Sequence, residues 1–326
     1  MPVLVALGIL VLAIIAILYK TLVGYGEYHW WTKLLVLLLL TISLGAPFIN
    51  FNLRNYGLTG IWIYLPKVLY FLFGYTLLLF IMMILRDVIW WIIDLVSHTP
   101  VEEMKNSAHL QKANIITIIF CLLFCFYGVY EAEKNPNIIT HNLTSSKIKK
   151  PTKIVMLNDL HIDKNVSPKR IRQIVERVNA QNPDAIVLVG DTVEISPEKL
   201  APQMVELKKL KAKDNVYFTL GNHEFYAGAF STALNLSGLG FVLLNNSGFK
   251  MDGYDVFMAG IPDIDTAQNH KMGVRFKNAI YGAAKDDYVI LLSHAPKLAE
   301  DVSKDNIDLQ LSGHTHGGQI YPFHYF

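Results

Sequence analysis

Five short apolar runs in the second half of the chain are followed by polar residues, among them aspartate, asparagine and histidine: NDLH, GD, GNHE, SH and GHTH. Carboxylate, imidazole and amide oxygen are the groups that divalent metals bind. The candidate residues at these ends are Asp159, His161, Asp191, Asn222, His223, His294, His314 and His316. These eight groups exceed the needs of one ion, so the pattern indicates a site for more than one metal.

The spacing of residues within two of these runs affects the direction in which their side chains project. Asp159 and His161 are two residues apart, as are His314 and His316. If the chain stays extended, both members of a pair project to the same side. Glycine directly precedes the polar residue in three of the runs, where a missing Cβ allows a sharp turn and close approach to an ion. Each residue alone has a plain structural explanation, and only the whole set indicates chemistry.

The elements that must position these groups follow from the apolar runs before them. Their β-branched residues predict strands over residues 153–159, 185–191, 215–222, 288–294 and 307–314. A helix is predicted over 168–181, capped by Ser167 and ended by the Asn-Pro-Asp turn after it. This alternation is typical of an α/β layer protein. Ligands in such sheets gather at the carboxyl ends of strands, so we expect the five ends to meet at one site.

The ordered blocks DLH, GD, GNHE, a lone histidine and GHTH resemble those of the calcineurin-like metallophosphoesterase superfamily. The match covers residues 153–319, and the stretches LLSHAP and GHTHGGQI are similar to the bacterial membrane-associated branch. The resemblance implies an α/β fold, a four-layer αββα sandwich, over residues 153–326. It also implies hydrolysis of a phosphomonoester, phosphodiester or pyrophosphate by a hydroxide that two metal ions share.

The resemblance further implies two metal sites joined by one bridging carboxylate. The first site would be formed by Asp159, His161 and His316. The second would be formed by Asn222, His294 and His314, with Asp191 as the bridge. His223 would be the catalytic residue, a general acid or charge stabiliser beside the scissile phosphate. Nitrogen and oxygen ligands without thiolate fit manganese, iron or zinc as the two divalent ions.

Four residues near these motifs are weighed separately. We expect Glu194 to be a surface charge. For Glu224 the sequence allows two roles equally: support of a metal ligand, or a solvated carboxylate in a loop. Phe225 and Tyr226 could either line a substrate pocket or pack beneath a loop. Packing beneath a loop is the commoner role of aromatic side chains.

The sequence predicts a multi-span transmembrane domain over residues 1–131 and a linker over 132–152. At the end of the linker, the stretch SSKIKKPTK (145–153) is expected to be solvated, with contact to anionic lipid as the less favoured alternative. Uncharged apolar stretches cover 2–19, 34–53, 68–85 and 113–130, each long enough to cross about 30 Å of hydrocarbon as a helix. Residues 86–96, with paired tryptophans between charges, fit either a helix leaving through the headgroup layer or a continuation of the third span. Cys121 and Cys125 fit apolar packing in the fourth span.

We therefore expect an integral membrane protein of the bacterial plasma (inner) membrane, in contact with the lipid bilayer. An even number of spans places the catalytic half on the side of the N-terminus. Lysine and arginine in the loops are equally divided between the two sides, so the charge pattern leaves that side open. The near balance of 29 basic and 27 acidic residues excludes nucleic acid as the expected partner.

The leading hypothesis is a membrane-anchored phosphoesterase whose phosphorylated substrate is lipid-linked, because four spans exceed what a soluble substrate requires. The alternative is a non-catalytic membrane scaffold or sensor with a phosphoesterase-like metal-binding domain. A transporter has little support because the spans contain almost no ionisable residues.

The last predicted ligand, His316, is followed by only ten residues, whereas the family fold continues with further strands. We therefore expect the sandwich to be C-terminally incomplete, with an exposed sheet edge. That edge would contain Ile320, Tyr321, Phe323, Tyr325 and Phe326.

Overall fold

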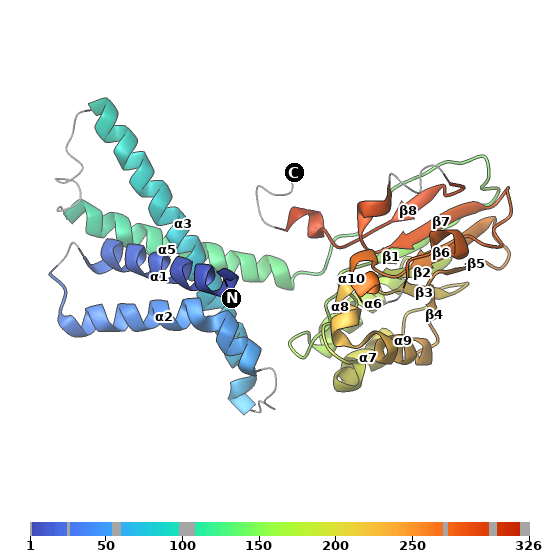
Figure 1. The fold of residues 1–326 in the computed structure, drawn as a ribbon, viewed down its shortest axis with the longest axis horizontal. Helices are drawn as coiled ribbons and strands as arrows, with labels where there is room; N and C mark the ends of the chain where they lie inside the picture. Colours follow the sequence, from blue (N-terminus) through green and yellow to red (C-terminus); the bar gives the residue numbers. More distant parts are fainter. Residues whose placement is uncertain are drawn as a thin grey trace. The chain divides into compact units, whose positions relative to one another are not determined.

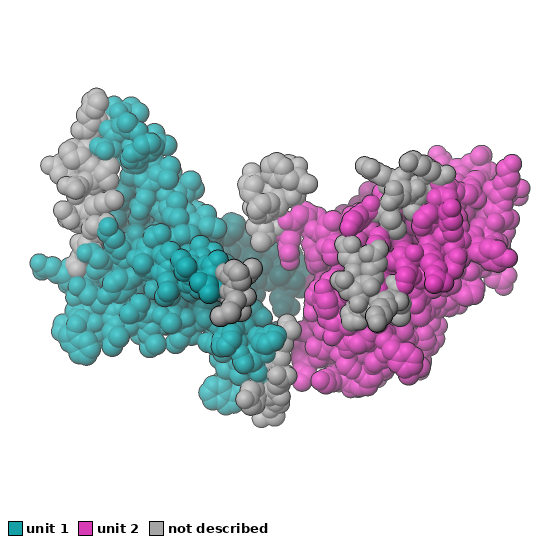
Figure 2. Space-filling model, in the orientation of Figure 1, with its two compact units in different colours: residues 1–134 teal, residues 135–326 magenta. Residues whose placement is uncertain are grey.

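A computed structural model describes residues 2–24, 27–53, 60–97, 108–269, 273–299 and 305–319. The chain divides into two compact units, residues 1–134 and residues 135–326 (Figures 1 and 2). The described secondary-structure elements of the first unit are all helices, and the second unit combines strands with helices. Each unit is therefore described by itself.

The helices of the first unit are α1 (Pro2–Val23), α2 (Trp30–Leu53), the short 3-10 helix η1 (Gly60–Tyr64), α3 (Leu65–Ser97) and α5 (Ala108–Glu133). Among the described residues, four of these helices are long and apolar enough to cross a membrane, which agrees with the four predicted spans. Residues 86–96 continue α3 without a break, which is the second of the two interpretations of that segment.

Apolar packing and a few hydrogen bonds join these helices. Leu18, Leu44, Met83 and Cys121 contribute one buried side chain from each of the four long helices to a common cluster. Between α2 and α3, the Ser43 and Thr76 hydroxyl oxygens lie 2.6 Å apart. Helices in lipid associate by such close packing and interhelical hydrogen bonds, because burial of apolar surface gives no advantage there. Cys121 thus has the packing role predicted for it.

The second unit contains two four-stranded sheets. The first is parallel, in the order β1 (Ile154–Leu157), β2 (Ala185–Val189), β3 (Val216–Thr219), β4 (Val242–Leu243). The second has the order β5 (Ser247–Lys250), β6 (Val256–Ile261), β7 (Tyr288–Ser293), β8 (Leu309–Leu311), with only β5 antiparallel to its neighbour. The five predicted strands correspond to β1, β2, β3, β7 and β8. The sequence did not predict β4, β5 or β6, which do not end in the polar motifs.

Helices connect and cover the strands. They are α6 (Pro168–Asn179), η2 (Pro197–Leu200), α7 (Ala201–Leu207), α8 (Asn222–Ala227), α9 (Ala229–Gly238), α10 (Ile264–Asn269), α11 (Phe276–Ala279), η3 (Pro296–Leu298) and η4 (His316–Gly318). The start of α6 is as predicted: the Arg170 backbone N–H donates to the Ser167 hydroxyl at 3.2 Å, and proline occupies the first turn.

Successive side chains along each strand pack on opposite faces of the sheet and so belong to different layers of this unit. Ile186 and Leu188 of β2 pack against α6 and α7, whereas Val187 faces the second sheet. On β7, Ile290 lies between the sheets and Leu291 packs toward α11. Period-two alternation with both faces buried requires a helical layer on each outer side. The predicted αββα sandwich is confirmed, with helices on both outer faces of the paired sheets (Figure 1).

Part of the predicted linker is structured. Lys147 Nζ lies 2.8 Å from Asp308 Oδ2, and Ile148 packs against the apolar core between the sheets. The stretch that the sequence predicted to be solvated therefore contacts the second unit before β1 begins. The predicted exposed edge over residues 320–326 lies outside the described residues.

Replacing Leu188 with alanine tests the outer core. Leu188 is buried between β2 and the helices, so Leu188→Ala is expected to destabilise the second unit by about 2–5 kcal/mol through lost burial and a cavity. Val205→Ala is the matched control, because Val205 is exposed on α7, and it should change stability by less than about 0.5 kcal/mol. Pulse proteolysis of the full chain across a urea series measures both, and equal midpoints would contradict the assigned layer.

Candidate metal centre

The carboxyl ends of β1, β2 and β3 from one sheet and of β7 and β8 from the other carry the predicted site residues. Six of these residues form two clusters, and within each cluster the potential ligand atoms lie within 4.8 Å of one another; a third such group joins His161 and His223 through Glu194. The first cluster consists of Asp159, His161 and His316. The second consists of Asp191, His294 and His314. Each cluster therefore draws on both sheets.

In the first cluster, two imidazole nitrogens face each other. His161 Nε2 lies 3.0 Å from His316 Nε2, and His316 Nε2 lies 3.8 Å from Asp159 Oδ1. The Asp159 carboxylate also accepts the backbone N–H of His314 at 3.1 Å, which joins the loop after β1 to the loop after β8. Two ring nitrogens and a carboxylate oxygen at this separation are suited to share one divalent cation.

In the second cluster, His294 Nε2 lies 3.1 Å from Asp191 Oδ2 and 3.1 Å from His314 Nδ1. The same Asp191 oxygen is 3.9 Å from His161 Nε2 of the first cluster. Asp191 is thus the carboxylate between the two clusters, which is the position that a bridging ligand requires. Burial would raise the pKa of Asp191, but its contacts with His294 outweigh burial and the pKa is lowered, so the ionised carboxylate is favoured.

His294 is completely buried and its tautomer is fixed. Its Nδ1–H donates to the Val189 carbonyl oxygen at 2.9 Å, because a carbonyl can only accept. Nε2 is therefore left facing Asp191. Gly190 is required beside this ring: its φ is +77°, and a Cβ there would lie 2.5 Å from His294 Nδ1.

Five of the predicted ligands have a backbone that non-glycine residues adopt rarely. Their φ values are +50° for Asp159, +45° for His161, +49° for Asp191, +69° for His314 and +48° for His316. The expectation that the two-residue pairs are extended is therefore wrong, since the chain turns at both members of each pair. Such strained positions concentrate at functional sites and cost of the order of 1–3 kcal/mol each.

Asn222 provides a test of whether this site fits a metal ion. Among the described residues, the side-chain oxygen Oδ1 of Asn222 is buried and has no hydrogen-bond partner. A buried, unpaired amide oxygen costs free energy unless something binds it. A divalent cation is a natural partner for such an oxygen, so the residues present fit the implied metal. The assignment of Asn222 and the other predicted ligands to two ions stays a prediction.

Glu194 is placed differently from its prediction as a surface charge. It is half-buried between two histidines: His161 Nδ1–H donates to Oε1 at 2.5 Å and His223 Nδ1–H donates to Oε2 at 2.8 Å. Burial would raise the pKa of Glu194, but these two bonds outweigh burial and lower it. The bond to Glu194 in turn raises the pKa of His161. Glu194 therefore orients one predicted ligand and the predicted catalytic residue together.

Glu224 is buried, which excludes the solvated alternative. Its carboxylate accepts four backbone N–H groups, from Gly221 at 2.7 Å and from residues 191, 192 and 193 at 2.8, 2.6 and 3.0 Å. Glu224 is the third residue of α8 and reaches back to the residue before the helix, in half of a capping box. Burial and the nearby Asp191 charge raise the pKa of Glu224, and the backbone donors of Val193, Gly221 and Asp191 oppose that rise.

The two aromatic residues after Glu224 have separate positions. Phe225 is buried in the core under the helices, whereas Tyr226 is 69% exposed. The Tyr226 ring lies edge-on to the His223 ring with centroids 5.5 Å apart. Of the two, Tyr226 is therefore the aromatic residue that is open to solvent beside the predicted site.

The sequence of this unit matches the family model for calcineurin-like phosphoesterases over residues 152–318, half of the chain. The chain belongs to the calcineurin-like phosphoesterase family. This metallophosphoesterase domain includes all eight predicted site residues. The family assignment made from the motif order is thereby confirmed.

Relatives extend the likeness to the membrane unit. The chain is 28% identical over 281 residues to an uncharacterized metallophosphoesterase of Campylobacter jejuni, covering 85% of this chain and 72% of the relative. An alignment of that length includes much of residues 1–134. It is also 32% identical over 235 residues to an uncharacterized metallophosphoesterase of Helicobacter pylori, covering 68% of this chain and 60% of the relative.

A vertebrate relative is also similar. The chain is 28% identical over 236 residues to the zebrafish (Danio rerio) protein called transmembrane protein with metallophosphoesterase domain, covering 68% of this chain and 53% of that protein. The chain thus spans between about half and three quarters of the length of these relatives. Together with the four apolar helices, these relatives support a membrane protein with a phosphoesterase domain.

Metal content tests the two clusters separately. We expect the metal-loaded chain to hold about two ions, and His161→Ala and His314→Ala each to hold about one, because each removes a ligand from a different cluster. His141→Ala is the control, since His141 is exposed outside both clusters, and it should retain both ions. Inductively coupled plasma mass spectrometry of the desalted protein gives the number of metal ions per chain. Equal metal loss in all three variants would contradict the assignment.

Replacing the Glu224 carboxylate tests its structural role. In Glu224→Gln an amide NH₂ must face backbone N–H groups that have no other acceptor, so the second unit should lose about 2 kcal/mol or more of stability. Glu176→Gln, on the exposed surface of α6, is the matched control. Urea unfolding of the full chain in detergent compares the two, and indistinguishable midpoints would refute the role given to Glu224.

Proposed function

We propose that this chain is a membrane-anchored, metal-dependent phosphoesterase that hydrolyses a phosphomonoester, phosphodiester or pyrophosphate. The observation that supports it most directly is the position of Asp191 between two histidine–carboxylate clusters. A single structural ion needs one closed ligand set, whereas two adjacent sets around a shared carboxylate are typical of phosphoryl-transfer sites.

Two groups of residues would hold the ions. Asp159, His161 and His316 would bind one, and Asn222, His294 and His314 the other, with Asp191 shared. Two bound divalent ions, for which manganese, iron or zinc suits these ligands, would supply Lewis acidity toward the phosphoryl oxygens and an activated water. The buried oxygen of Asn222 supports its inclusion in the second set.

His223 is the residue that we propose to handle the proton of the leaving group. Its Nδ1–H is committed to Glu194, so its free nitrogen Nε2 faces the centre, 4.0 Å from Asp191 Oδ2. In the imidazolium form, His223 can donate the Nε2 proton to the departing oxygen, while the Glu194 carboxylate offsets the positive charge. Its backbone N–H donates to Asp191 Oδ1 at 2.9 Å, which fixes the distance between acid and clusters.

The substrate that we propose is a lipid-linked phosphate or pyrophosphate at the surface of a bacterial plasma membrane. Four apolar helices attach the domain to the bilayer, so a substrate in that bilayer reaches the site without dissociating from its membrane. The exposed ring of Tyr226 beside His223 offers an apolar surface to the part of the substrate next to its phosphate.

Activity measurements on matched histidine variants test this function. With manganese present, His223→Ala should lower kcat for p-nitrophenyl phosphate or its diester by about 10²–10⁴, the usual contribution of a general acid. Asp191→Ala should abolish hydrolysis because it removes the shared carboxylate. His141→Ala should retain full activity. Activity that persists in Asp191→Ala would overturn the proposed site.

A substrate comparison tests the lipid-linked part of the proposal. The chain in detergent should hydrolyse phosphatidic acid or a polyprenyl pyrophosphate with a higher kcat/KM than the soluble nitrophenyl esters. Faster turnover of the soluble diester would refute the proposal of a lipid-linked substrate, but it would leave the proposed phosphoesterase function standing.

A further inference from the structure

Charge is unevenly divided over the second unit. Residues 168–179 and 199–213 contain nine basic and two acidic residues, a net charge of +7. The rest of residues 135–326 contains twelve basic and eighteen acidic residues, a net charge of −6. The two basic segments form α6, α7 and the turn after α7, which cover the outer face of the first sheet. A strongly basic face thus lies on a unit whose total charge is close to zero.

Most of this positive charge is in contact with solvent. Lys208, Lys209 and Lys211 are exposed in the turn after α7. Acidic groups neutralise only part of it: Glu206 oxygens lie 2.9 Å from Arg172 Nη2 and 2.7 Å from Lys209 Nζ. Asp184, outside the two segments, pairs with Lys213 at 2.9 Å. The other acidic residue of the two segments, Glu176, is exposed on α6.

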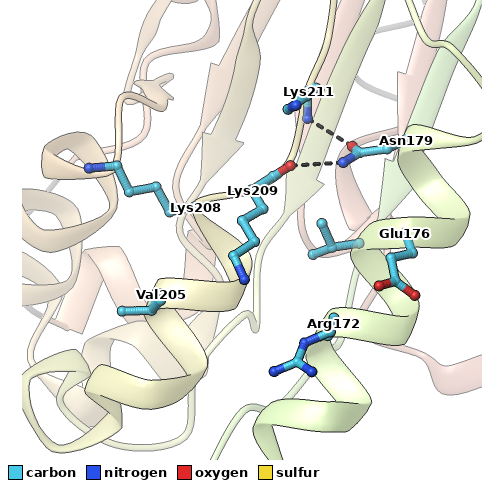
Figure 3. Close-up of a pocket in the computed structure, with 8 residues that line it drawn as sticks. Arg172, Glu176, Asn179, Val205, Lys208, Lys209 and Lys211 are labelled. Carbon is cyan, nitrogen blue, oxygen red and sulfur yellow. Dashed lines mark hydrogen bonds between the residues drawn. The ribbon is translucent and has the colours of Figure 1, made fainter.

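The lysine turn is held against α6. Asn179 at the end of α6 donates from Nδ2 to the Lys209 carbonyl at 2.8 Å and accepts the Lys211 backbone N–H at 2.9 Å (Figure 3). Between α6 and α7 lies a surface groove of about 610 Å³ that combines these basic residues with the 60% exposed side chain of Val205. The groove is lined by residues of this layer and by none of the eight site residues.

The same helical layer exposes large apolar side chains. Phe230 is 82% exposed and Leu234 is 63% exposed, and their four-residue spacing places both on one face of α9. The opposite side of α9 is fixed, since Leu236 is buried in the core and Asn235 Nδ2 donates to Glu198 at 2.8 Å. A well-anchored helix therefore presents two bare apolar side chains to its surroundings.

The chain that comes from the membrane unit contacts this layer first. Arg177 of α6 donates from Nη2 to the carbonyl oxygen of Pro136 at 3.3 Å. Pro136 is three residues beyond the end of the last apolar helix, α5, at Glu133. The segment that directly follows this membrane-type helix is therefore hydrogen-bonded to the basic layer.

We propose that the outer helical layer of α6, α7 and α9 docks on the surface of an anionic lipid bilayer. Lysine and arginine side chains would face the headgroups, and Phe230 and Leu234 would insert at the boundary with the acyl chains. Charge complementarity, and the hydrogen bond of the layer to Pro136 just after a helix suited to span a bilayer, favour a bilayer over an acidic soluble protein as the occupant. Because α8 carries Tyr226 beside His223 and leads into α9, docking keeps the metal centre beside the lipid surface.

Spin labels on the full chain test this docking without any hydrolysis step, so its outcome is independent of the proposed function. Cys121 and Cys125 are first replaced by alanine, and single cysteines are then placed at Phe230, Leu234 or Tyr281. Tyr281 is the matched control, because it is 87% exposed and follows α11 on the opposite outer layer. Thermal unfolding of each labelled chain verifies that its fold is retained.

In nanodiscs that contain phosphatidylglycerol, labels at Phe230 and Leu234 should become accessible to oxygen and protected from a water-soluble nickel complex. The label at Tyr281 should remain accessible to nickel. Nickel accessibility at Phe230 equal to that at Tyr281 would overturn the proposal. Protection by added polyglutamate, without protection in anionic nanodiscs, would also overturn it and assign the face to an acidic protein.

Lysine variants test the electrostatic contribution. Lys208→Gln and Lys211→Gln should each reduce the docked-to-undocked ratio about fivefold, the factor for one lysine near an anionic surface. Lys285→Gln, an exposed lysine outside the basic segments, should leave that ratio unchanged. The accessibility of the spin label at position 234 is measured in all three variants. Equal effects of the three substitutions would contradict an attraction of the bilayer to this basic face in particular.

Discussion

The turn after β2 is held by the buried carboxylate of Glu224, and the rest of the metal centre depends on that attachment. Four backbone N–H groups from two separate loops converge on its two oxygens. They fix the backbone of Asp191, the shared carboxylate, relative to the start of α8, where Asn222 and His223 lie. One buried acid therefore sets the spacing between a predicted bridge, a predicted ligand and the proposed proton donor.

The centre combines strained backbone with closely spaced polar groups, and the surrounding fold must offset both costs. Positive φ at five non-glycine residues requires loops that cannot relax, and the buried strands before them provide that rigidity. Hydrogen bonds fix the rings of His161, His223 and His294 through Nδ1, leaving Nε2 of each directed at the centre. The protein's own hydrogen bonds thus set the orientation of these three rings.

The sequence predicted those parts of the fold and site that depend on local pattern. Apolar runs with polar ends located five strands, and uncharged stretches located four helices, because both are properties of consecutive residues. Glu194 was missed because its role depends on His161 and His223, which are 33 and 29 residues away. Glu224 carried only a weak local signal, its place three residues after the glycine before a helix, because the capping-box pattern needs serine or threonine where this chain has Gly221.

The GHTH motif connects the fold to the proposed chemistry, because its two histidines belong to different clusters. An extended chain would direct His314 and His316 to one ion, but positive φ at both sends His314 toward His294 and His316 toward His161. Each cluster then contains ligands from the first and the second sheet. Any ion bound there would cross-link the two halves of the sandwich, so metal binding and the packing of the sheets must stabilise each other.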